Sequence, residues 1–159
     1  MPGSVYLETS IISYLAAQPS RDLIVAAHQQ ITHEWWGRRR SQFDLFVSQL
    51  VLEEAAAGDS DAAERRLRPL SGIQLLEINE AIRAVARQLL EGIPLPVRAG
   101  ADSVHIAVVH GMDYLLTWNC THIANAELRP SVERICLSQG FVAPALCTPD
   151  ELMGGESLD

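Results

Sequence analysis

Four oxygen-bearing side chains lie close to the ends of apolar runs or at the starts of helical patterns. They are Glu8, Glu54, Asp102 and Asn119. Glu8 directly follows the apolar run 5–7, and Asn119 comes shortly after the run 114–116. Carboxylates that are brought together repel one another and stay ionised only where a cation neutralises them. If the fold joins these positions, the three acids can hold a divalent metal ion with Asn119 assisting.

All four candidates offer oxygen atoms, which favours Mg²⁺ or Mn²⁺ over zinc. Such an ion can activate water and stabilise the charge on the leaving oxygen of a phosphodiester. The pattern therefore indicates metal-dependent phosphodiester hydrolysis. Glu53 and Glu54 lie about 100° apart around the axis of an expected helix, so only one of them can face the site well. Taken singly, each of the three acids is more often a helix cap or a solvated charge, and only their joint pattern favours a shared site.

Five strand-like apolar runs alternate with helical patterns along the chain. Strands are expected at 4–7, 44–47, 73–76, 113–116 and 141–147. Helices are expected at 10–17, 21–42, 49–57, 60–67, 79–91, 100–110, 119–127 and 130–138. This alternation predicts an α/β protein with a three-layer α/β/α fold around a central parallel sheet of about five strands. In such a sheet the carboxyl ends of the strands share one crevice, and Glu8 and Asn119 follow two of these ends.

Several helix ends carry sequence signals. Asn79 is expected to cap the fifth of these helices, and Ser48 the third. The segment Thr148 to Glu151 is typical of a capping box with proline at the first helical position. With Ser48 as the cap, Glu54 falls nearly two turns inside its helix.

The composition is that of a globular protein in water. Of the 159 residues, 48% are hydrophobic and 20% are charged, a balance that suits one domain with a substantial core. We expect a single domain over residues 1–153 and a flexible C-terminal tail over 154–159. No apolar stretch approaches the roughly 20 residues of a membrane span, and the N-terminus lacks the features of a signal peptide. A cytoplasmic protein with no membrane attachment is expected.

The chain is acidic, with a net charge of −8, yet all twelve of its basic residues are arginine. An acidic molecule repels polyanions at long range, so binding of nucleic acid needs a local basic patch. Arg38, Arg39 and Arg40 form such a cluster near Trp35 and Trp36, and arginine beside an aromatic ring suits single-stranded RNA. The two tryptophans cannot both face one way, and helix packing or a dimer contact explains at least one of them equally well.

Four short motifs together resemble the PIN-domain family. They are Tyr6-Leu7-Glu8-Thr9-Ser10, Val47-Ser48-x-x-Val51-Leu52-Glu53-Glu54, Ala101-Asp102-x-x-His105-Ile106-Ala107 and Leu115-Leu116-Thr117-Trp118-Asn119. Each motif is short, but their order and approximate spacing match the family over nearly the whole chain. Within the family, the chain is similar to VapC-like proteins.

This resemblance implies a PIN-like fold and a Mg²⁺- or Mn²⁺-dependent endoribonuclease, often the toxin of a type II toxin–antitoxin pair. It also implies an RNA substrate, a homodimer, and inhibition by a small antitoxin protein. The positions that match the family's metal site are Glu8, Glu54, Asp102 and Asn119. The positions that match its supporting hydroxyls are Thr9, Ser10 and Thr117.

Two of the matched residues depart from the family pattern. Glu8 is one methylene longer than the usual Asp, and Asn119 is neutral where Asp is frequent. An amide oxygen can still coordinate a metal or hold a bridging water, so Asn119 is expected to support the site from outside the three acids.

Two other functions compete with the nuclease. A catalytically weak PIN module that binds RNA or a protein partner is favoured by the neutral Asn119 and by the net charge of −8. Phosphoryl transfer to an aspartate requires Asp after the first strand, where this chain has Glu8. His105, three residues after Asp102, is expected to be a packed, hydrogen-bonded core histidine and not a metal ligand.

Overall fold

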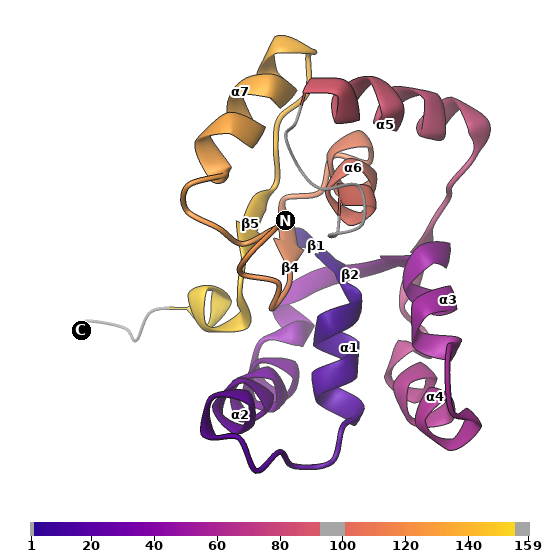
Figure 1. Cartoon of the computed structure of the whole chain (residues 1–159), viewed down its shortest axis with the longest axis vertical. Coiled ribbons are helices and arrows are strands. Elements are labelled where there is room, and N and C mark those ends of the chain that lie inside the picture. Colours follow the sequence, from indigo (N-terminus) through magenta and orange to yellow (C-terminus); the bar gives the residue numbers. More distant parts are fainter. Residues whose placement is uncertain (1, 93–100, 155–159) are drawn as a thin grey trace.

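A five-stranded, all-parallel β-sheet forms the centre of the computed structural model, which describes residues 2–92 and 101–154 (Figure 1). The strands are β1 (Gly3–Leu7), β2 (Phe43–Ser48), β3 (Gln74–Leu76), β4 (Tyr114–Leu116) and β5 (Ala145–Cys147). Their order across the sheet is β3-β2-β1-β4-β5, and each neighbouring pair is parallel. The predicted α/β class and the central parallel sheet are confirmed.

Helices cover both sides of this sheet. In the described part of the chain they are α1 (Thr9–Ala16), α2 (Leu23–Arg38), α3 (Gln49–Ala56), α4 (Ser60–Leu67), α5 (Glu80–Gly92), α6 (Ala101–Val109) and α7 (Arg129–Ser138). Short 3-10 turns form η1 (Arg40–Gln42), η2 (Arg68–Leu70) and η3 (Pro149–Leu152). Helices α1 to α4 gather on one side and α5 to α7 on the other (Figure 1). This arrangement is consistent with the predicted three-layer α/β/α fold.

The two helical layers follow from the path of the chain. The chain moves outward from β1 through β2 to β3, and then returns past β1 to build β4 and β5. Crossovers between parallel strands are right-handed, so reversing the direction of travel moves the connecting helices to the other face. The reversal creates a switch point between β1 and β4, and ligands bind outside the carboxyl ends of the strands at such a point.

The strands on either side of the switch point are in register. Leu7 of β1 pairs with Leu116 of β4, and the backbone N–H of Glu8 donates to the Leu116 carbonyl at 3.1 Å. The residues that follow these strands, Glu8 and Thr117, are therefore neighbours at the mouth of the switch point.

The two central strands are buried on both faces. Val5, Tyr6 and Leu7 of β1 and Leu115 and Leu116 of β4 are fully buried. A parallel sheet covered by helices on both faces has strands that are continuously apolar, without polar alternation. Short uninterrupted apolar runs therefore identified these strands in the sequence.

The helix expected over 119–127 does not form. These residues adopt turns, in which Asn119 Oδ1 accepts from the His122 N–H at 3.0 Å and Asn125 Oδ1 accepts from the Glu127 N–H at 2.9 Å. Asparagine side chains that bond to the local backbone compete with the helical hydrogen-bond ladder. The prediction of a helix here was wrong because these local bonds outweighed the apolar spacing.

Two further elements are shorter than expected. The helix expected over 21–42 is α2 followed by the separate turn η1, and the strand expected over 141–147 begins only at Ala145. Pro144, just before that strand, has no N–H to donate to a neighbouring strand, which limits the hydrogen-bond ladder of β5, an outermost strand of the sheet.

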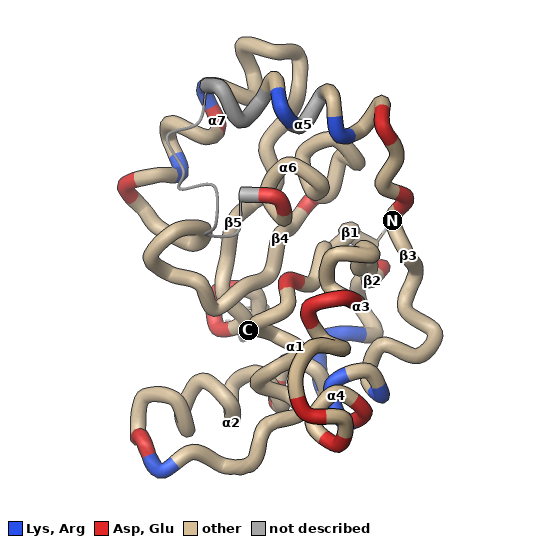
Figure 2. The backbone as a smooth tube through the Cα atoms, turned by 45° about the vertical axis from the view of Figure 1, so that its right-hand side comes forward, with Lys and Arg blue, Asp and Glu red and all other residues tan. Residues whose placement is uncertain are grey.

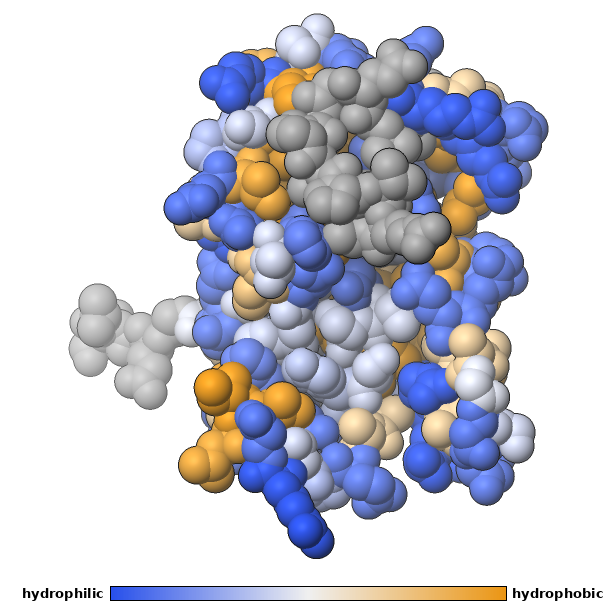
Figure 3. All heavy atoms as spheres, viewed as in Figure 1, coloured by the Kyte–Doolittle hydropathy of each residue, from blue (hydrophilic) through white to orange (hydrophobic). Residues whose placement is uncertain are grey.

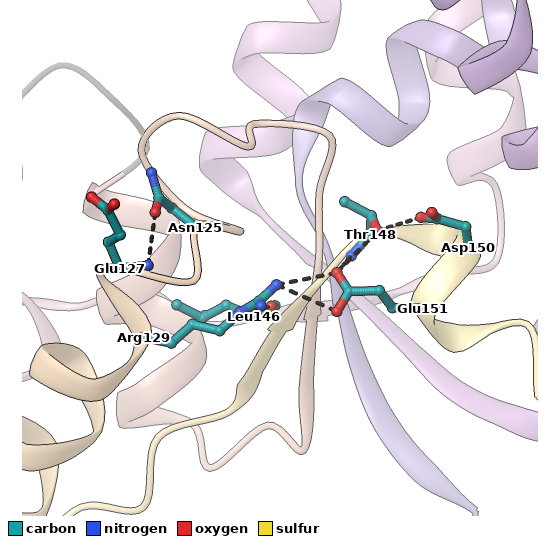
Figure 4. A network of polar contacts seen from close by, with 7 residues as sticks. All are labelled: Asn125, Glu127, Arg129, Leu146, Thr148, Asp150 and Glu151. Carbon is teal, nitrogen blue, oxygen red and sulfur yellow. Dashed lines mark hydrogen bonds and ion pairs between the residues drawn. The ribbon is translucent and has the colours of Figure 1, made fainter.

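Two of the three predicted helix caps are present. Asn79 Oδ1 accepts from the backbone N–H three residues later at 2.9 Å. The capping box joins the side chains and backbones of Thr148 and Glu151 at the start of η3 (Figure 4). The side chain of Ser48, however, does not cap α3. Its hydroxyl is instead 2.8 Å from the hydroxyl of Tyr6.

Arg129 connects the closing segment of the chain to the sheet. Its Nε donates to the Leu146 carbonyl of β5 at 2.9 Å, and its guanidinium lies 3.1 Å from the Glu151 carboxylate (Figure 4). The turn η3 also packs against α2. The end of the described chain is thus held against two different layers.

Some predictions concern residues that the structure does not describe. Of the expected tail over 154–159, only Gly154 is described, and the expected helix start at Gly100 lies outside the described residues. Among the helices of residues 2–92 and 101–154, none is both long enough and apolar enough to cross a membrane.

Candidate active site

Glu8 stands at the switch point and is held there by its neighbours. It is buried, with 9% of its surface exposed. One carboxylate oxygen caps α1 by accepting from the Ser10 N–H, and the other accepts from the Thr117 hydroxyl at 3.1 Å. These bonds fix the orientation of this carboxylate.

Two hydroxyls link the segments that follow β1 and β4. Ser10 Oγ accepts from the Trp118 N–H at 2.9 Å, and Thr117 Oγ1 accepts from the Asn119 N–H at 3.0 Å. Ser10 and Thr117 therefore lie next to Glu8, as expected for hydroxyls that support the site.

Two further carboxylates approach Glu8 from opposite helical layers. Glu54 lies on α3 and Asp102 in the first turn of α6, and both residues are exposed. Partial burial raises the pKa of Glu54, a contact with the Thr9 hydroxyl lowers it, and the charges of Glu8 and Asp102 raise it further. The net shift is upward, so Glu54 is harder to ionise than an ordinary glutamate. Glu54 is thus within electrostatic reach of both Glu8 and Asp102.

The two adjacent acids of α3 have different surroundings. The charge of Glu54 interacts with Glu8 and Asp102, whereas Glu53 lines a cavity between α3, α5 and α6. Of the two alternatives that the sequence left open, Glu54 is the one whose pKa responds to the charge of Glu8, whereas Glu53 shares its cavity with Asp102.

Tyr6 lies beneath these carboxylates and connects three elements. Burial raises the pKa of Tyr6 to about 12, hydrogen bonding with Ser48 and Ser103 lowers it, and the charges of Glu54 and Glu8 raise it. The phenol therefore stays protonated at neutral pH, where it joins β1 to the end of β2 and to α6. One signal for this role was overlooked in the sequence: Tyr6 is a side chain with a polar tip among the apolar residues of its run.

The donor set fits a hard divalent cation. All of its donors are oxygens, and mutually repelling carboxylates are stabilised by a cation between them. Among the described residues, no three acidic, histidine or cysteine side chains are gathered closely enough to form a ready-made metal-binding group. In the same part of the chain, the buried Thr9 hydroxyl has no partner with hydrogen-bond geometry. Because the three acids are not gathered in this structure, an ion would be held only after the exposed Glu54 and Asp102 side chains turn toward Glu8.

Asn119 is placed beside the acids through Thr117. Its backbone N–H donates to the Thr117 hydroxyl, and its side-chain oxygen accepts from the His122 N–H at 3.0 Å. The structure therefore places the fourth predicted residue next to the site, with its amide oxygen turned toward its own loop.

The arginine cluster lies at the amino ends of the strands, opposite to the ends where the acids lie. Arg38 to Arg40 come just before β2, at the amino ends of the strands, whereas Glu8 and Asn119 follow carboxyl ends. Arg39 donates to the Leu152 carbonyl at 3.3 Å and to Gln42 Oε1 at 2.6 Å. The guanidinium of Arg40 lies 4.5 Å from the centre of the Trp36 ring. Contacts within the protein thus engage two of the three arginines that were expected to bind RNA.

Trp35 is unavailable for stacking on RNA. Its side chain is 0% exposed, its Nε1–H donates to the Leu152 carbonyl at 3.2 Å, and its ring stacks on Phe43 at a centroid distance of 5.9 Å. The prediction of an RNA contact for Trp35 was wrong, and the alternative of helix packing is confirmed for this residue. The sequence could not distinguish RNA contact from helix packing for Trp35. Trp35 and Trp36 are adjacent on one helix, and the sequence does not determine which of them faces the core.

A cavity of about 440 Å³ adjoins the acids between α3, α5 and α6. Asp102 lines it, together with His105, Arg83 and Arg87, which the sequence analysis did not assign to the site. His105 is buried as expected, but neither of its ring nitrogens has a hydrogen-bond partner among the described residues. Burial lowers its pKa to about 4, although the charge of Asp102 acts in the opposite direction. In the sequence, the spacing of Arg83 and Arg87 by one helical turn was the signal that could have identified them as neighbours on one helix face.

Neither sequence comparison relates the chain to a known family. A scan against protein-family models found no match, and a search of the curated proteins likewise found none.

Proposed function

We propose that the protein is a Mg²⁺- or Mn²⁺-dependent endoribonuclease of the PIN type, which hydrolyses RNA phosphodiester bonds. The observation that supports this proposal most is the buried Glu8 carboxylate at the switch point, whose charge opposes the ionisation of Glu54. Glu8 follows a strand end, and Glu54 and Asp102 lie on helices of two opposite layers beside a switch point, where α/β proteins bind ligands. A fold gains no stability from such repulsion, so a cationic ligand is the simplest reason for it.

Each residue of the site has a distinct part in this proposal. Glu8, Glu54 and Asp102 would hold the ion, with Asn119 assisting. A bound ion of this class activates water and stabilises charge on the leaving oxygen. Ser10 and Thr117 keep the Glu8 carboxylate oriented through their hydrogen bonds.

The test is cleavage of a mixed RNA pool with Mg²⁺, Mn²⁺ or EDTA, comparing the wild type with Asp102→Asn. Asp44→Asn is the matched control, because it makes the same chemical change at an exposed position in β2, near the amino edge of the sheet. We expect metal-dependent cleavage by the wild type and the control, and none by Asp102→Asn. Full cleavage by Asp102→Asn would refute the assignment of this site.

A catalytically weak module that binds RNA or a protein partner is the second candidate. It is favoured by the amide oxygen of Asn119, which bonds to the His122 backbone, and by the net charge of −8. Titration with Mn²⁺ distinguishes the two candidates. A nuclease should bind the ion in a manner that depends on Asp102, whereas a binding module should not.

We further propose that the nuclease is the toxin of a type II pair, with a homodimeric state and a small antitoxin as its partner. An apolar patch over α2 supports a protein partner (Figure 3), since Leu23 is 86% exposed and Ile24 is 70% exposed at the start of this helix. Light scattering of the wild type and of a Leu23→Ser/Ile24→Ser double variant tests the dimer. An unchanged mass would exclude this patch as the dimer interface.

A further inference from the structure

The cavity between α3, α5 and α6 combines an apolar lining with charged residues. Its lining includes Leu50, Ile78, Ile82 and Ile106 as apolar residues and Gln49, Glu53, Arg83, Arg87, Asp102 and His105 as polar ones. Its volume of about 440 Å³ is within the range of about 300 to 1,000 Å³ that is typical of small-ligand sites. The cavity shares Asp102 with the candidate active site, so a ligand in it would lie next to the acids.

A buried histidine in this lining lacks the partners that such a group normally has. His105 is 1% exposed, and neither Nδ1 nor Nε2 has a hydrogen-bond partner among the described residues. Leaving a buried polar group unpaired costs about 1 to 3 kcal/mol, so it is rarely retained without a reason. A neutral imidazole offers one donor and one acceptor, which matches the alternating donors and acceptors on the edge of a nucleobase.

Two arginines supply the positive charge of the cavity. Arg83 and Arg87 are one helical turn apart on α5, and both are exposed. Figure 2 shows basic positions along α5 and acidic positions on α3 and at the start of α6. Guanidinium groups bind phosphate oxygens in a bidentate manner. A ligand that suits both features has a flat apolar part and an anionic part.

We propose that this cavity binds one nucleotide of the RNA substrate, next to the phosphodiester bond that is cleaved. Its base lies against Leu50, Ile82 and Ile106, and its phosphate is bound by Arg83 and Arg87. The edge of the base is bonded by His105 once the buried ring of this residue turns toward the cavity. This inference rests on the proposed nuclease function for the identity of the ligand, but the binding itself requires no metal ion. Cleavage should therefore depend on the base at this position.

The test is calorimetric titration of the wild-type protein with each of the four 5′-ribonucleoside monophosphates in EDTA. We expect binding of at least one, with unequal affinities among the four. An Arg83→Gln/Arg87→Gln double variant should bind the same nucleotide at least about tenfold more weakly, because charge-assisted bonds to the phosphate are lost. Arg65→Gln, at an exposed position on α4, is the matched control and should bind like the wild type.

A second variant tests the recognition of the base. His105→Phe keeps a buried ring without its nitrogens, and its circular dichroism and thermal midpoint show whether it folds. It should lose the preference among the four nucleotides while Arg83 and Arg87 still bind phosphate. Should His105→Phe unfold, the arginine double variant alone decides the outcome.

The outcomes separate this inference from the proposed function. Nucleotide binding in EDTA without any metal-dependent cleavage of RNA would retain the pocket and reject the nuclease. Metal-dependent cleavage without nucleotide binding, or binding that the arginine variant leaves unchanged, would overturn the pocket. A protein segment would then be the occupant to test.

Discussion

Two acidic residues near opposite edges of the sheet, Asp113 and Glu54, differ in how their charge is accommodated. Asp113 stands just before β4, and its Oδ2 accepts from the Ser4 N–H at 2.9 Å and from the Ser4 hydroxyl at 3.1 Å. The same hydroxyl accepts from the Asp113 N–H at 2.9 Å. This carboxylate is therefore paired within the protein and joins the amino ends of β1 and β4.

Glu54 has the opposite environment at the carboxyl edge. Partial burial has the largest effect and raises its pKa, the Thr9 hydroxyl lowers it, and the charges of Glu8 and Asp102 raise it further. A carboxylate with hydrogen-bond donors around it stabilises the fold, whereas one among other carboxylates is available to a cation. The comparison predicts that acids near the amino edge affect stability and acids near the carboxyl edge affect activity.

The largest expected effect is on catalysis. Asp102→Asn should lower metal-dependent cleavage by more than about a hundredfold, beyond the loss typical of a residue that only supports a metal ligand. Asp102 is exposed, so its substitution should change the unfolding free energy by no more than about 0.5 kcal/mol. Single-turnover cleavage and thermal melts measure the two effects. A large loss of stability in this variant would remove the contrast between the two edges.

Asp113→Ala should have the converse effect. Loss of the bonds to Ser4 should lower the unfolding free energy by about 1 to 2 kcal/mol, which corresponds to a fall of about 2 to 8 °C in Tm for a chain of this size. Cleavage at a temperature well below the melt should remain at the wild-type rate. Differential scanning calorimetry checks the first expectation. A loss of cleavage in the folded variant would show that the amino edge also serves the site.

Glu54→Gln should stabilise the protein slightly in metal-free buffer. The pKa of Glu54 is raised in the folded state, so ionisation favours the unfolded chain, and the cost is present once the pH has risen through the raised pKa. Removing the charge should therefore raise stability at neutral pH by less than about 1 kcal/mol, because the side chain is partly exposed. The melt is measured in EDTA and again in Mn²⁺. Stabilisation by Mn²⁺ should be weaker in the variant than in the wild type.

The smallest effect concerns pH. Because a protonated carboxyl cannot hold a cation well, Mn²⁺ affinity of the wild type should fall as the pH drops through the raised pKa of Glu54. This step should lie above the ordinary glutamate range and should be absent in Glu54→Gln. Calorimetric titration between pH 5 and about 8 tests this expectation, a window that includes the region where a raised carboxyl pKa titrates. Identical pH profiles for both proteins would contradict it.

The strands and the first acid were predictable because their signals are local. The run Val5 to Leu7 is continuously apolar, as a strand buried on both faces requires, and Glu8 is the residue that ends it. The capping role of Asn79 is likewise local, because its side chain accepts from a backbone N–H only three residues later. The loop over 119–127 was not predictable from apolar spacing, because asparagine side chains decided its conformation through their own backbone bonds.

The partners of individual side chains depend on residues far along the chain. Ser48 was expected to cap its helix by a local rule, but the Tyr6 hydroxyl lies beside it in the neighbouring strand. Trp35 was equally suited to a surface or a core, and its burial came from Leu152 and Phe43. Neither competing partner can be recognised without the order of the strands.

The sequence by itself determined the types of the elements and the positions of the four oxygen-bearing candidates, because spacing and near neighbours control these features. Only the tertiary structure decided which acid of α3 interacts with the charge of Glu8, and that His105 lies beside a cavity with no hydrogen-bond partner in the described part of the chain. The bond between Thr117 and Glu8 spans 109 positions of the chain. Such contacts follow from the reversal of the chain at β1 and β4, which brings distant segments to one edge of the sheet.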